Sequence, residues 1–501
     1  MSSILTSRQT LELHKAILQY LEPLLEDNQL VFKQLVGVLN VENDDAAVPN
    51  YLEKKWSTVL RLQKRILDLE NEVNSYKSLL DSRPLGTDGL VAKDKINWLP
   101  SAPTKKFPTQ SSQLVSSVTL HPTLPLVVAG CSDGTLLAWS LAAEDTLIPQ
   151  KQWNGHTRGI NRIRWSLEPV DLANSKTKLY VLALCSSDLS IKIWEGDSFK
   201  HVRTLTGHEH TVSGVAFSPT NPTVLYSVSR DKSVKVWDLV NGYCVKTYVG
   251  HSDWVRDLDV ALVNSSMLLS EMKKSSLGDF IVTCSNDQSV RISHESGTGL
   301  ALLLGHSHVI ETVRFLPMYS NEYLDKFILK NMDRFPTLLE ELINDPVYRE
   351  SLGFKYCVSA GRDNLIKLWL LPPPTLRPHR PPTPATQNNS QGWHIADLVG
   401  HLSWVKSLEI HPNGRFLISG ADDKTVNIWD LKSLTDTGKI SVMKLLSGHE
   451  GFVNSVHFAK FELDKSGNKE DTKENLMAAI QKSMRCLFVS GGTDNSVRLW
   501  G

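Results

Sequence analysis

The stretch Gly207–Asp238, which reads GHEHTVSGVAFSPTNPTVLYSVSRDKSVKVWD, decides how the rest of this chain is arranged. It opens with Gly207-His208 and closes with Trp237-Asp238, and apolar residues alternate with polar ones over three short segments in between. Such alternation is typical of β-strands that bury one face, and Arg230-Asp231-Lys232 separates the second segment from the third as a tight turn does. One unit of this size cannot bury its apolar face alone, so further copies must stack against it.

The same unit recurs along the chain. Its copies are marked by a histidine after glycine, a turn aspartate and a closing tryptophan, namely His156, Asp188 and Trp194; His208, Asp231 and Trp237; His251 and Asp287; His306, Asp363 and Trp369; His401, Asp423 and Trp429; and His449, Asp494 and Trp500. A copy ahead of these keeps Asp133 and Trp139 without the Gly-His pair, and Ser293 replaces the tryptophan of the fourth copy, which predicts a looser fourth blade. This is the signature of the WD repeat, and seven copies predict an all-β, seven-bladed WD40 β-propeller over residues 105–501.

The order of strands predicts how this propeller closes. Each unit supplies the outer strand of one blade and the three inner strands of the next, so the unit that ends at Gly501 leaves the last blade without an outer strand. We expect residues 106–111 to supply that strand and to protect the exposed edge. Within each unit, the histidine, the aspartate, a strand Ser or Thr and the tryptophan are expected to form one hydrogen-bonded set, so the histidines are interpreted as structural rather than metal-binding.

Loops of an antiparallel blade alternate between the two faces of the disc. The long insertions lie between first and second strands or after a third strand, at residues 167–178, 262–279, 317–353, 461–484 and 371–392. Connectivity places all of them on one face, which we call the insertion face. The opposite face carries the Gly-His pairs and the turn aspartates. We call it the turn face, and it is predicted to be free of insertions.

Helical patterns precede the repeats. Apolar residues recur at helical spacing over residues 8–39 with a break at Pro23, which predicts a pair of short helices within residues 1–40, interpreted as a dimerisation segment rather than a simple helical cap. A seven-residue spacing then predicts a parallel two-stranded coiled coil over residues 51–81, and prolines and glycines mark residues 82–104 as a linker. The predicted seam of the coiled coil consists of Leu52, Val59, Leu62, Ile66, Leu69, Val73, Tyr76 and Leu80.

Composition excludes several classes of function. The 54 basic and 54 acidic side chains give a net charge of zero, which argues against bulk nucleic acid as the partner. No run approaches the roughly 20 apolar residues of a membrane span, and the polar start does not resemble a signal peptide. The six cysteines form no C-x-x-C pair, and neither a G-x-S-x-G motif, a Walker loop nor an H-E-x-x-H motif is present. We therefore expect no metal and no cofactor, and we predict an interaction protein rather than an enzyme.

Cationic and aromatic residues are predicted to gather on the turn face. Arg230, Arg362 and Lys424 flank turn aspartates, and the triplets Trp254-Val255-Arg256 and Trp404-Val405-Lys406 each follow a Gly-His pair by the same offset. Any one of these charges is explained by solubility alone. Their repetition on one face is harder to explain that way, because Trp and Arg are the residue types enriched at binding hot spots. The pattern predicts a surface for an acidic protein partner, since nucleic acid would require more clustered positive charge.

The chain resembles the lissencephaly / nuclear distribution family of dynein regulators, and most of all its fungal members. The resemblance covers nearly the whole chain apart from the insertions, in the order of LisH-type helical pair, coiled coil and propeller. The local sequences that carry it are Leu52-Glu53-Lys54-Lys55-Trp56, Arg61-Leu62-Gln63-Lys64, Pro84-Leu85-Gly86, Ser229-Arg230-Asp231-Lys232, Gly242-Tyr243-Cys244-Val245-Lys246-Thr247, Cys284-Ser285-Asn286-Asp287-Gln288 and Ala421-Asp422-Asp423-Lys424-Thr425.

The resemblance implies a non-catalytic homodimer whose propeller binds the motor domain of the dynein heavy chain. The motor-binding residues of the family match Arg230, Arg256, Arg362, Trp404 and Lys424 here, and Trp254 belongs to the same predicted surface. It further implies an Nde-type coiled-coil adaptor, association with microtubule complexes, and a place in the cytoplasm, at microtubule ends and at the spindle pole, with roles in nuclear migration and spindle positioning. Two alternatives share these parts: a substrate receptor of a ubiquitin ligase and a regulatory subunit of a lipid acetylhydrolase.

Overall fold

The computed structural model of the protein describes residues 7–23, 28–39, 64, 66, 99–109, 113–141, 148–172, 178–196, 198–261, 277–377, 380–384, 391–458 and 487–501. They belong to two compact units, Met1–Asp94 and Lys95–Gly501, each of which is described by itself. Among these residues, no helix has both the length and the apolar character that a membrane crossing requires.

The first unit contains the predicted helical pair. Helices α1 (Ser7–Leu21) and α2 (Gln29–Leu39) lie on either side of Pro23, which confirms the predicted break. Nδ1 of His14 lies 3.2 Å from the carbonyl oxygen of Leu39, so the middle of the first helix meets the end of the second. Ile66 is helical and 54% exposed in the single chain, and the other predicted seam residues of the coiled coil lie outside the described residues, as do residues 82–98 of the predicted linker.

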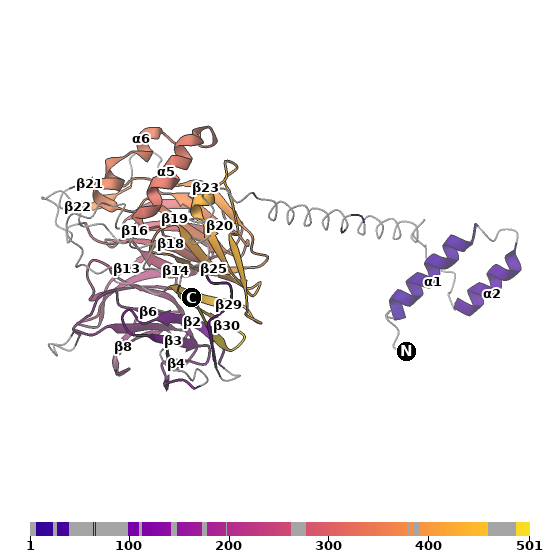
Figure 1. Cartoon of the computed structure of the whole chain (residues 1–501), viewed down its shortest axis with the longest axis horizontal. Helices are drawn as coiled ribbons and strands as arrows, with labels where there is room; N and C mark the ends of the chain where they lie inside the picture. The colour runs from indigo at the N-terminus through magenta and orange to yellow at the C-terminus, as the bar shows by residue number, and fades with distance from the viewer. Residues whose placement is uncertain are drawn as a thin grey trace, which may run out of the picture. The chain divides into compact units, whose positions relative to one another are not determined.

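The second unit is the predicted propeller (Figure 1), and its seven blades are antiparallel sheets. Blade 1 contains β2 (Val115–Leu120), β3 (Leu126–Cys131), β4 (Thr135–Ser140) and β5 (Lys151–Asn154); blade 2 contains β6 (Ile160–Trp165), β7 (Val181–Ser186), β8 (Ser190–Glu195) and β9 (His201–Thr206); blade 3 contains β10 (Val212–Phe217), β11 (Val224–Ser229), β12 (Ser233–Asp238) and β13 (Tyr243–Val249). Blade 4 contains β14 (Val255–Val260), β15 (Phe280–Ser285), β16 (Ser289–His294) and β17 (Gly299–Leu304); blade 5 contains β18 (Ile310–Phe315), β19 (Tyr356–Gly361), β20 (Ile366–Leu370) and β23 (Trp393–Val399). Blade 6 contains β24 (Val405–Ile410), β25 (Phe416–Ala421), β26 (Thr425–Asp430) and β28 (Lys444–Ser447); blade 7 contains β29 (Val453–Phe458), β30 (Phe488–Gly492), β31 (Ser496–Trp500) and β1 (Lys105–Pro108).

Closure of the ring follows the prediction, with a small shift of the strand boundaries. Strand β1 pairs antiparallel with β31, from Lys105 opposite Leu499 to Pro108 opposite Ser496, so it begins and ends earlier than the predicted segment 106–111. Phe107 of β1 is completely buried between blades 7 and 1. Leu99 is also buried, in the core of blades 6 and 7, and its carbonyl oxygen accepts a hydrogen bond from Nζ of Lys444 at 2.9 Å. The described end of the predicted linker is therefore part of the propeller.

The predicted hydrogen-bonded set is complete in blades 3, 5, 6 and 7. In blade 3, Nδ1 of His208 lies 2.7 Å from Asp231, Nε2 of His208 lies 2.7 Å from Oγ of Ser227, and the indole of Trp237 donates to the same oxygen at 2.8 Å. The same contacts recur in blades 5, 6 and 7. Blade 2 keeps the contact of His156 with Asp188, at 2.9 Å, but the indole nitrogens of Trp139 in blade 1 and Trp194 in blade 2 are buried without a hydrogen-bond partner among the described residues, so the prediction was wrong for these two blades. In blade 4, Ser293 stands at the position of the tryptophan and has no indole group. Its hydroxyl lies 3.0 Å from the phenol oxygen of Tyr248. The predicted looseness of blade 4 stays a prediction.

The insertion of residues 317–353 folds as a helical layer between β18 and β19. It contains η2 (Met318–Ser320), α5 (Asn321–Lys330), η3 (Met332–Arg334), α6 (Glu340–Ile343) and η4 (Val347–Leu352). Figure 1 shows α5 and α6 grouped at one side of the propeller. The buried Lys355 anchors the layer, because its ammonium group donates to Asp325 at 2.5 Å and to the carbonyl oxygen of Ile343 at 2.6 Å.

Two further elements were not predicted. The insertion 371–392 contains a hairpin of β21 (Thr375–Arg377) and β22 (Arg380–Thr383). A loop of the sixth unit, which begins with η5 (Leu431–Ser433), carries β27 (Lys439–Ser441), and β27 pairs in parallel with β23 as a fifth strand of blade 5. Strand order confirms that the insertions with described ends join first to second strands or follow a third strand, so the described loops of the turn face are the Gly-His loops, the aspartate turns and part of the segment between β1 and β2.

Candidate turn-face site

Two arginine–tryptophan stacks occupy equivalent places on the turn face. The guanidinium carbon of Arg230, in the turn after β11, lies 4.7 Å from the ring centroid of Trp254, which immediately precedes β14 of the next blade. The guanidinium carbon of Arg362, in the turn after β19, lies 4.3 Å from the ring centroid of Trp404, which precedes β24. Cation–π contacts of this kind orient both partners. The same Arg–Trp stack thus lies at the junction of blades 3 and 4 and at that of blades 5 and 6.

A ring of bulged residues surrounds the mouth of the central channel. The innermost strand of every blade has a register irregularity at its second residue, so that residue has no direct partner on the neighbouring strand. A bulge bends the strand and redirects the side chain of the extra residue, as often happens beside functional sites. We call these seven residues the bulge ring, and they are Ser116, Asn161, Ser213, Arg256, Glu311, Lys406 and Asn454.

The charged members of the bulge ring bind the residue that precedes the turn aspartate of their own blade. In blade 4, Nε of Arg256 donates to Asn286 at 2.6 Å. In blade 5, Nε of Arg362 donates to Glu311 at 2.6 Å, and in blade 6 Nζ of Lys406 lies 3.1 Å from Asp422. Each pair ties the inner strand to the turn, and it fixes both side chains before any partner arrives.

Glu311 links two blades through its carboxylate. One oxygen accepts the hydrogen bond from Arg362, and the other lies 3.8 Å from Nη1 of Arg256. The side chains of Arg256 and Glu311 are each only 14% exposed, so Arg256 lines the channel mouth instead of standing free in solvent. A carboxylate shared by two guanidinium groups holds them near one another, which their mutual repulsion would otherwise oppose.

Arg230 differs from the other arginines of this face. The bulge-ring residue of its own blade is Ser213, which is too short and uncharged to pair with it. Within the part of the chain that the structure describes, Nε of Arg230 is buried without a hydrogen-bond partner. Burial and the neighbouring charge of Arg256 lower the pKa of Arg230, and the charge of Glu311 opposes this shift without reversing it.

An ion network fills the channel below the bulge ring. Asp257 of β14 accepts from Arg162 of β6 at 3.1 Å and from Arg314 of β18 at 2.8 Å. Glu409 of β24 lies 3.2 Å from Arg164 of β6, on the far side of the channel. Burial would raise the pKa of Asp257, but Arg162 and Arg314 outweigh it and lower that pKa to about 2. The network cross-links four blades and leaves the charge of Asp257 fully paired.

Apolar side chains continue the turn face over blades 6, 7 and 1. Leu402 is 87% exposed and Trp404 39% exposed, and both lie in the loop before β24. Phe452 and Leu114, which precede β29 and β2, are exposed in the same way. A patch that combines exposed apolar residues with the cations of blades 3 to 6 is typical of a protein-binding surface rather than of a nucleic-acid site.

The structure places the predicted site residues as follows. Arg230, Trp254, Arg256, Arg362 and Trp404 lie on the turn face and contact one another in the two stacks and through Glu311. Lys424 lies in the turn after β25 with a φ of +70°. It is exposed and takes no part in the stacks or in the contacts of Glu311.

Sequence reasoning missed Glu311, Asn286 and the channel ion network. Glu311 occupies the second position of its innermost strand, which is the same position of the repeat in every blade, but neither Asn286 nor the channel network is at that position. In the described part of the chain, no group of three or more His, Cys, Asp or Glu residues is placed to hold a metal ion. Cys131, Cys185, Cys284 and Cys357 are buried on second strands, and burial raises the pKa of Cys185 to about 12.

Comparisons with known proteins agree with this architecture. Residues 101–140 and 392–430 match the family described as WD domain, G-beta repeat, and residues 176–274 match the first beta-propeller of WD repeat-containing protein 75. The chain is 56% identical over 520 residues to nuclear distribution protein PAC1 of Scheffersomyces stipitis, which covers 100% of this chain and 99% of that protein. It is 56% identical over 523 residues to PAC1 of Debaryomyces hansenii, covering 99% of both chains, and 31% identical over 507 residues to nuclear distribution protein nudF of Aspergillus niger, covering 100% of both. The chain therefore belongs to the fungal PAC1 and nudF family of nuclear distribution proteins, the family that its sequence motifs resembled.

Proposed function

We propose that this protein is a non-catalytic regulator of cytoplasmic dynein that acts as a homodimer. Its propeller binds the motor domain of the dynein heavy chain through the turn face and controls the attachment of the motor to microtubules, its activation and its targeting. The biological roles that follow are nuclear migration and spindle positioning. Membership of a nuclear distribution family supports this proposal.

One observation supports the turn face above all as the contact surface. Two Arg–Trp stacks occupy equivalent positions two blades apart. Glu311 contacts both Arg256, beside the first stack, and Arg362 of the second. Their side chains are held by neighbours before binding, which lowers the entropic cost of ordering them against a partner. Trp and Arg in fixed positions, beside exposed Leu402 and Phe452, match the composition of protein-binding hot spots.

A binding assay with a purified motor domain tests this surface. We expect the variant that combines Arg230→Ala, Arg256→Ala, Arg362→Ala, Trp404→Ala and Lys424→Ala to lose motor binding, because it removes the cations and one stacking ring. The matched control is Lys326→Ala with Lys330→Ala on α5, which removes exposed charge from the insertion layer. Equal retention of the motor by the turn-face variant and the control, with both chains folded by circular dichroism, would refute the proposal.

The dimer is proposed to form through the LisH-type helical pair and the parallel coiled coil of residues 51–81. Ile66 is helical and exposed in the single chain, as a seam residue without its partner helix would be. Ile66→Asp should yield monomers, because a charge in the seam of a coiled coil is strongly unfavourable. Lys64→Asp, on the predicted polar side of the helix, should remain dimeric. Light scattering after gel filtration measures both masses, and dimers of Ile66→Asp would assign dimerisation to the helical pair alone.

Dimerisation would place two propellers on one motor assembly and raise the effective concentration of the second contact. The remaining partners that we propose are an Nde-type coiled-coil adaptor and microtubule-associated complexes, with the protein in the cytoplasm, on the cytoskeleton, at microtubule ends and at the spindle pole. Neither nucleic acid nor insertion into a membrane is part of this function. The propeller acts by favouring some conformations of the motor over others.

A further inference from the structure

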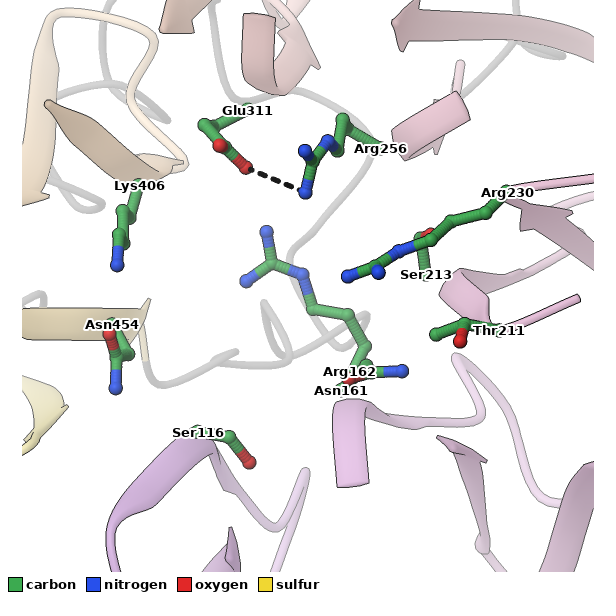
Figure 2. A pocket seen from close by; sticks show the side chains of 10 residues that line it. All are labelled: Ser116, Asn161, Arg162, Thr211, Ser213, Arg230, Arg256, Glu311, Lys406 and Asn454. Atoms are coloured by element: carbon green, nitrogen blue, oxygen red, sulfur yellow. Dashed lines mark ion pairs between the residues drawn. The ribbon is translucent and has the colours of Figure 1, made fainter. Parts of the chain in front are cut away.

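The channel mouth on the turn face contains a hollow of about 250 Å³. The motor-binding proposal assigns no ligand to this hollow. Figure 2 shows its ten lining side chains, and those of Arg162, Arg230 and Arg256 extend toward a common space. All seven residues of the bulge ring line the hollow, together with Arg162, Thr211 and Arg230. They come from several blades, so only the closed propeller assembles the hollow.

The hollow has an excess of positive charge. Arg162, Arg230, Arg256 and Lys406 line it, whereas Glu311 is the one acidic side chain among the lining residues. Glu311 is already shared by Arg256 and Arg362, so its charge is neutralised. The charges of Arg162 and Lys406 are balanced by Asp257 and Asp422, at 3.1 Å each. Arg230 is therefore the lining cation whose guanidinium group forms no ion pair with a carboxylate among the described residues.

Unused hydrogen-bond donors accompany this charge. Nε of Arg230 and the hydroxyl of Ser213 are both buried without a hydrogen-bond partner among the described residues, and both residues line the hollow. The hydroxyl of Thr211 lines it as well. A buried polar group without a partner is costly, and such groups in a native protein call for an explanation. Here the missing partner is a group that accepts hydrogen bonds and carries negative charge.

We propose that the hollow at the channel mouth binds a phosphate-type oxyanion, held by Arg230 and Arg256 and by the hydroxyls of Thr211 and Ser213. A guanidinium group presents paired N–H donors that match the oxygens of a phosphate, and a tetrahedral anion offers acceptors to donors that converge from several blades. The volume exceeds what a single water needs, so a phosphate fits with part of its hydration shell. The oxyanion belongs either to a free phosphate compound or to a phosphorylated side chain of a bound protein.

Isothermal titration calorimetry of the full chain with sodium pyrophosphate tests the site. Sodium sulfate and sodium chloride at matched ionic strength control for general screening, and we expect pyrophosphate to bind at one site per chain more tightly than either. Arg230→Gln should weaken binding roughly ten- to a hundredfold, the effect of losing hydrogen bonds from a charged group. Lys424→Gln, which removes an exposed cation of the same face outside the hollow, should leave the affinity unchanged. Binding of pyrophosphate no tighter than that of the control salts, or equal affinity of Arg230→Gln and wild type, overturns the proposal.

Ser213→Ala provides a second variant that should fold without difficulty, because the hydroxyl that it removes has no described partner. It should weaken pyrophosphate binding severalfold, and unchanged affinity would exclude Ser213 from the site. A short phosphoserine peptide and its unphosphorylated twin distinguish the sources of the oxyanion. Binding of the phosphopeptide alone, sensitive to Arg230→Gln, assigns the site to a phosphorylated protein, whereas binding of pyrophosphate without the peptide assigns it to a free phosphate compound.

The outcome is separable from the motor-binding proposal. Trp404→Ala and Lys424→Gln should weaken the motor contact and leave pyrophosphate affinity intact, because neither residue lines the hollow. Loss of motor binding in these variants without any pyrophosphate site in the wild type would reject the oxyanion proposal alone. A pyrophosphate site in the wild type, together with unchanged motor binding in these variants, would reject the motor-binding proposal alone.

Discussion

The ring of Trp254 lies between two arginines, with the guanidinium carbon of Arg230 at 4.7 Å and that of Arg256 at 5.6 Å from its centroid. Arg230 belongs to blade 3, and Trp254 and Arg256 belong to blade 4. The stack is therefore a contact between blades as well as a part of the binding face. This relationship gives the turn face a rigidity that can be measured without any partner.

We expect a favourable coupling between Arg230 and Trp254 in the stability of the free protein. A double-mutant cycle of Arg230→Ala, Trp254→Ala and the double variant, followed by urea denaturation, should give a coupling free energy of about 0.5–1 kcal/mol for a partly exposed cation–π pair. Arg230→Ala combined with Trp404→Ala is the control, because the two residues belong to different stacks and should be additive. Additive effects in the first cycle would mean that the stack contributes nothing to stability.

Removal of the shared carboxylate should loosen the turn face. Glu311→Gln leaves Arg256 and Arg362 without their common anion, and we expect a loss of about 1–3 kcal/mol in the free energy of unfolding, the cost of a broken charged hydrogen bond in a mostly buried place. Glu322→Gln is the matched control, since Glu322 and Lys326 form an exposed pair on α5 that is worth at most about 0.5 kcal/mol. Similar losses in both variants would show that Glu311 has no special role.

The channel ion network should make stability depend on pH in an acidic window. The pKa of Asp257 in the folded protein is about 2, below its ordinary value of 3.8, so its contribution is complete above pH 3.8 and is lost as the pH falls through about 2. Urea midpoints measured between pH 5 and pH 2 should therefore fall steeply. In a folded Asp257→Asn variant, this slope should be smaller by up to about 1.4 kcal/mol per pH unit, the effect of one proton. An unchanged slope in Asp257→Asn would contradict the prediction.

The strand that closes the ring should be essential to stability. Phe107 of β1 is completely buried between the first and last blades, so Phe107→Ala should reduce the free energy of unfolding by about 3–5 kcal/mol. Lys106→Ala changes the exposed neighbour in the same strand and should have an effect of less than about 0.5 kcal/mol. Hydrogen exchange should show the loss first in β31, the partner of β1. Equal stability of the two variants would mean that blade 7 does not depend on β1 for its packing.

Much of this architecture could be predicted from local sequence. The Gly-His pair, the turn aspartate and the tryptophan recur at fixed places, so the number of blades followed from the count of repeats. The closure by a segment within residues 106–111 and the division into a turn face and an insertion face followed from the order of strands in each repeat. The residues Arg230, Arg362 and Trp404 could be assigned to one face for the same reason.

Contacts between blades could not be predicted in this way. The pairing of Arg256 with Glu311 joins innermost strands of different blades, and it depends on a bulge that leaves no distinct residue type in the sequence. The contact of Arg164 with Glu409 crosses the channel, so its distance is set by the diameter of the closed ring rather than by spacing along the chain. Strand β27 joins blade 5 through a loop of the next unit, for which a short polar segment gives no signal.

The pairing of β1 with β31 also fixes the order of events during synthesis. Residues 105–108 are synthesised before all seven sets of inner strands, whereas their partners, residues 496–499, follow those of the first six blades. The first strand of the propeller must therefore wait for its partner while the intervening blades are made, and the ring can be completed only after β31 has been synthesised. During that interval, the apolar side chain of Phe107 lacks the packing of blade 7 and is open to other chains. A chain truncated before β31 is for that reason expected to be the form most exposed to aggregation.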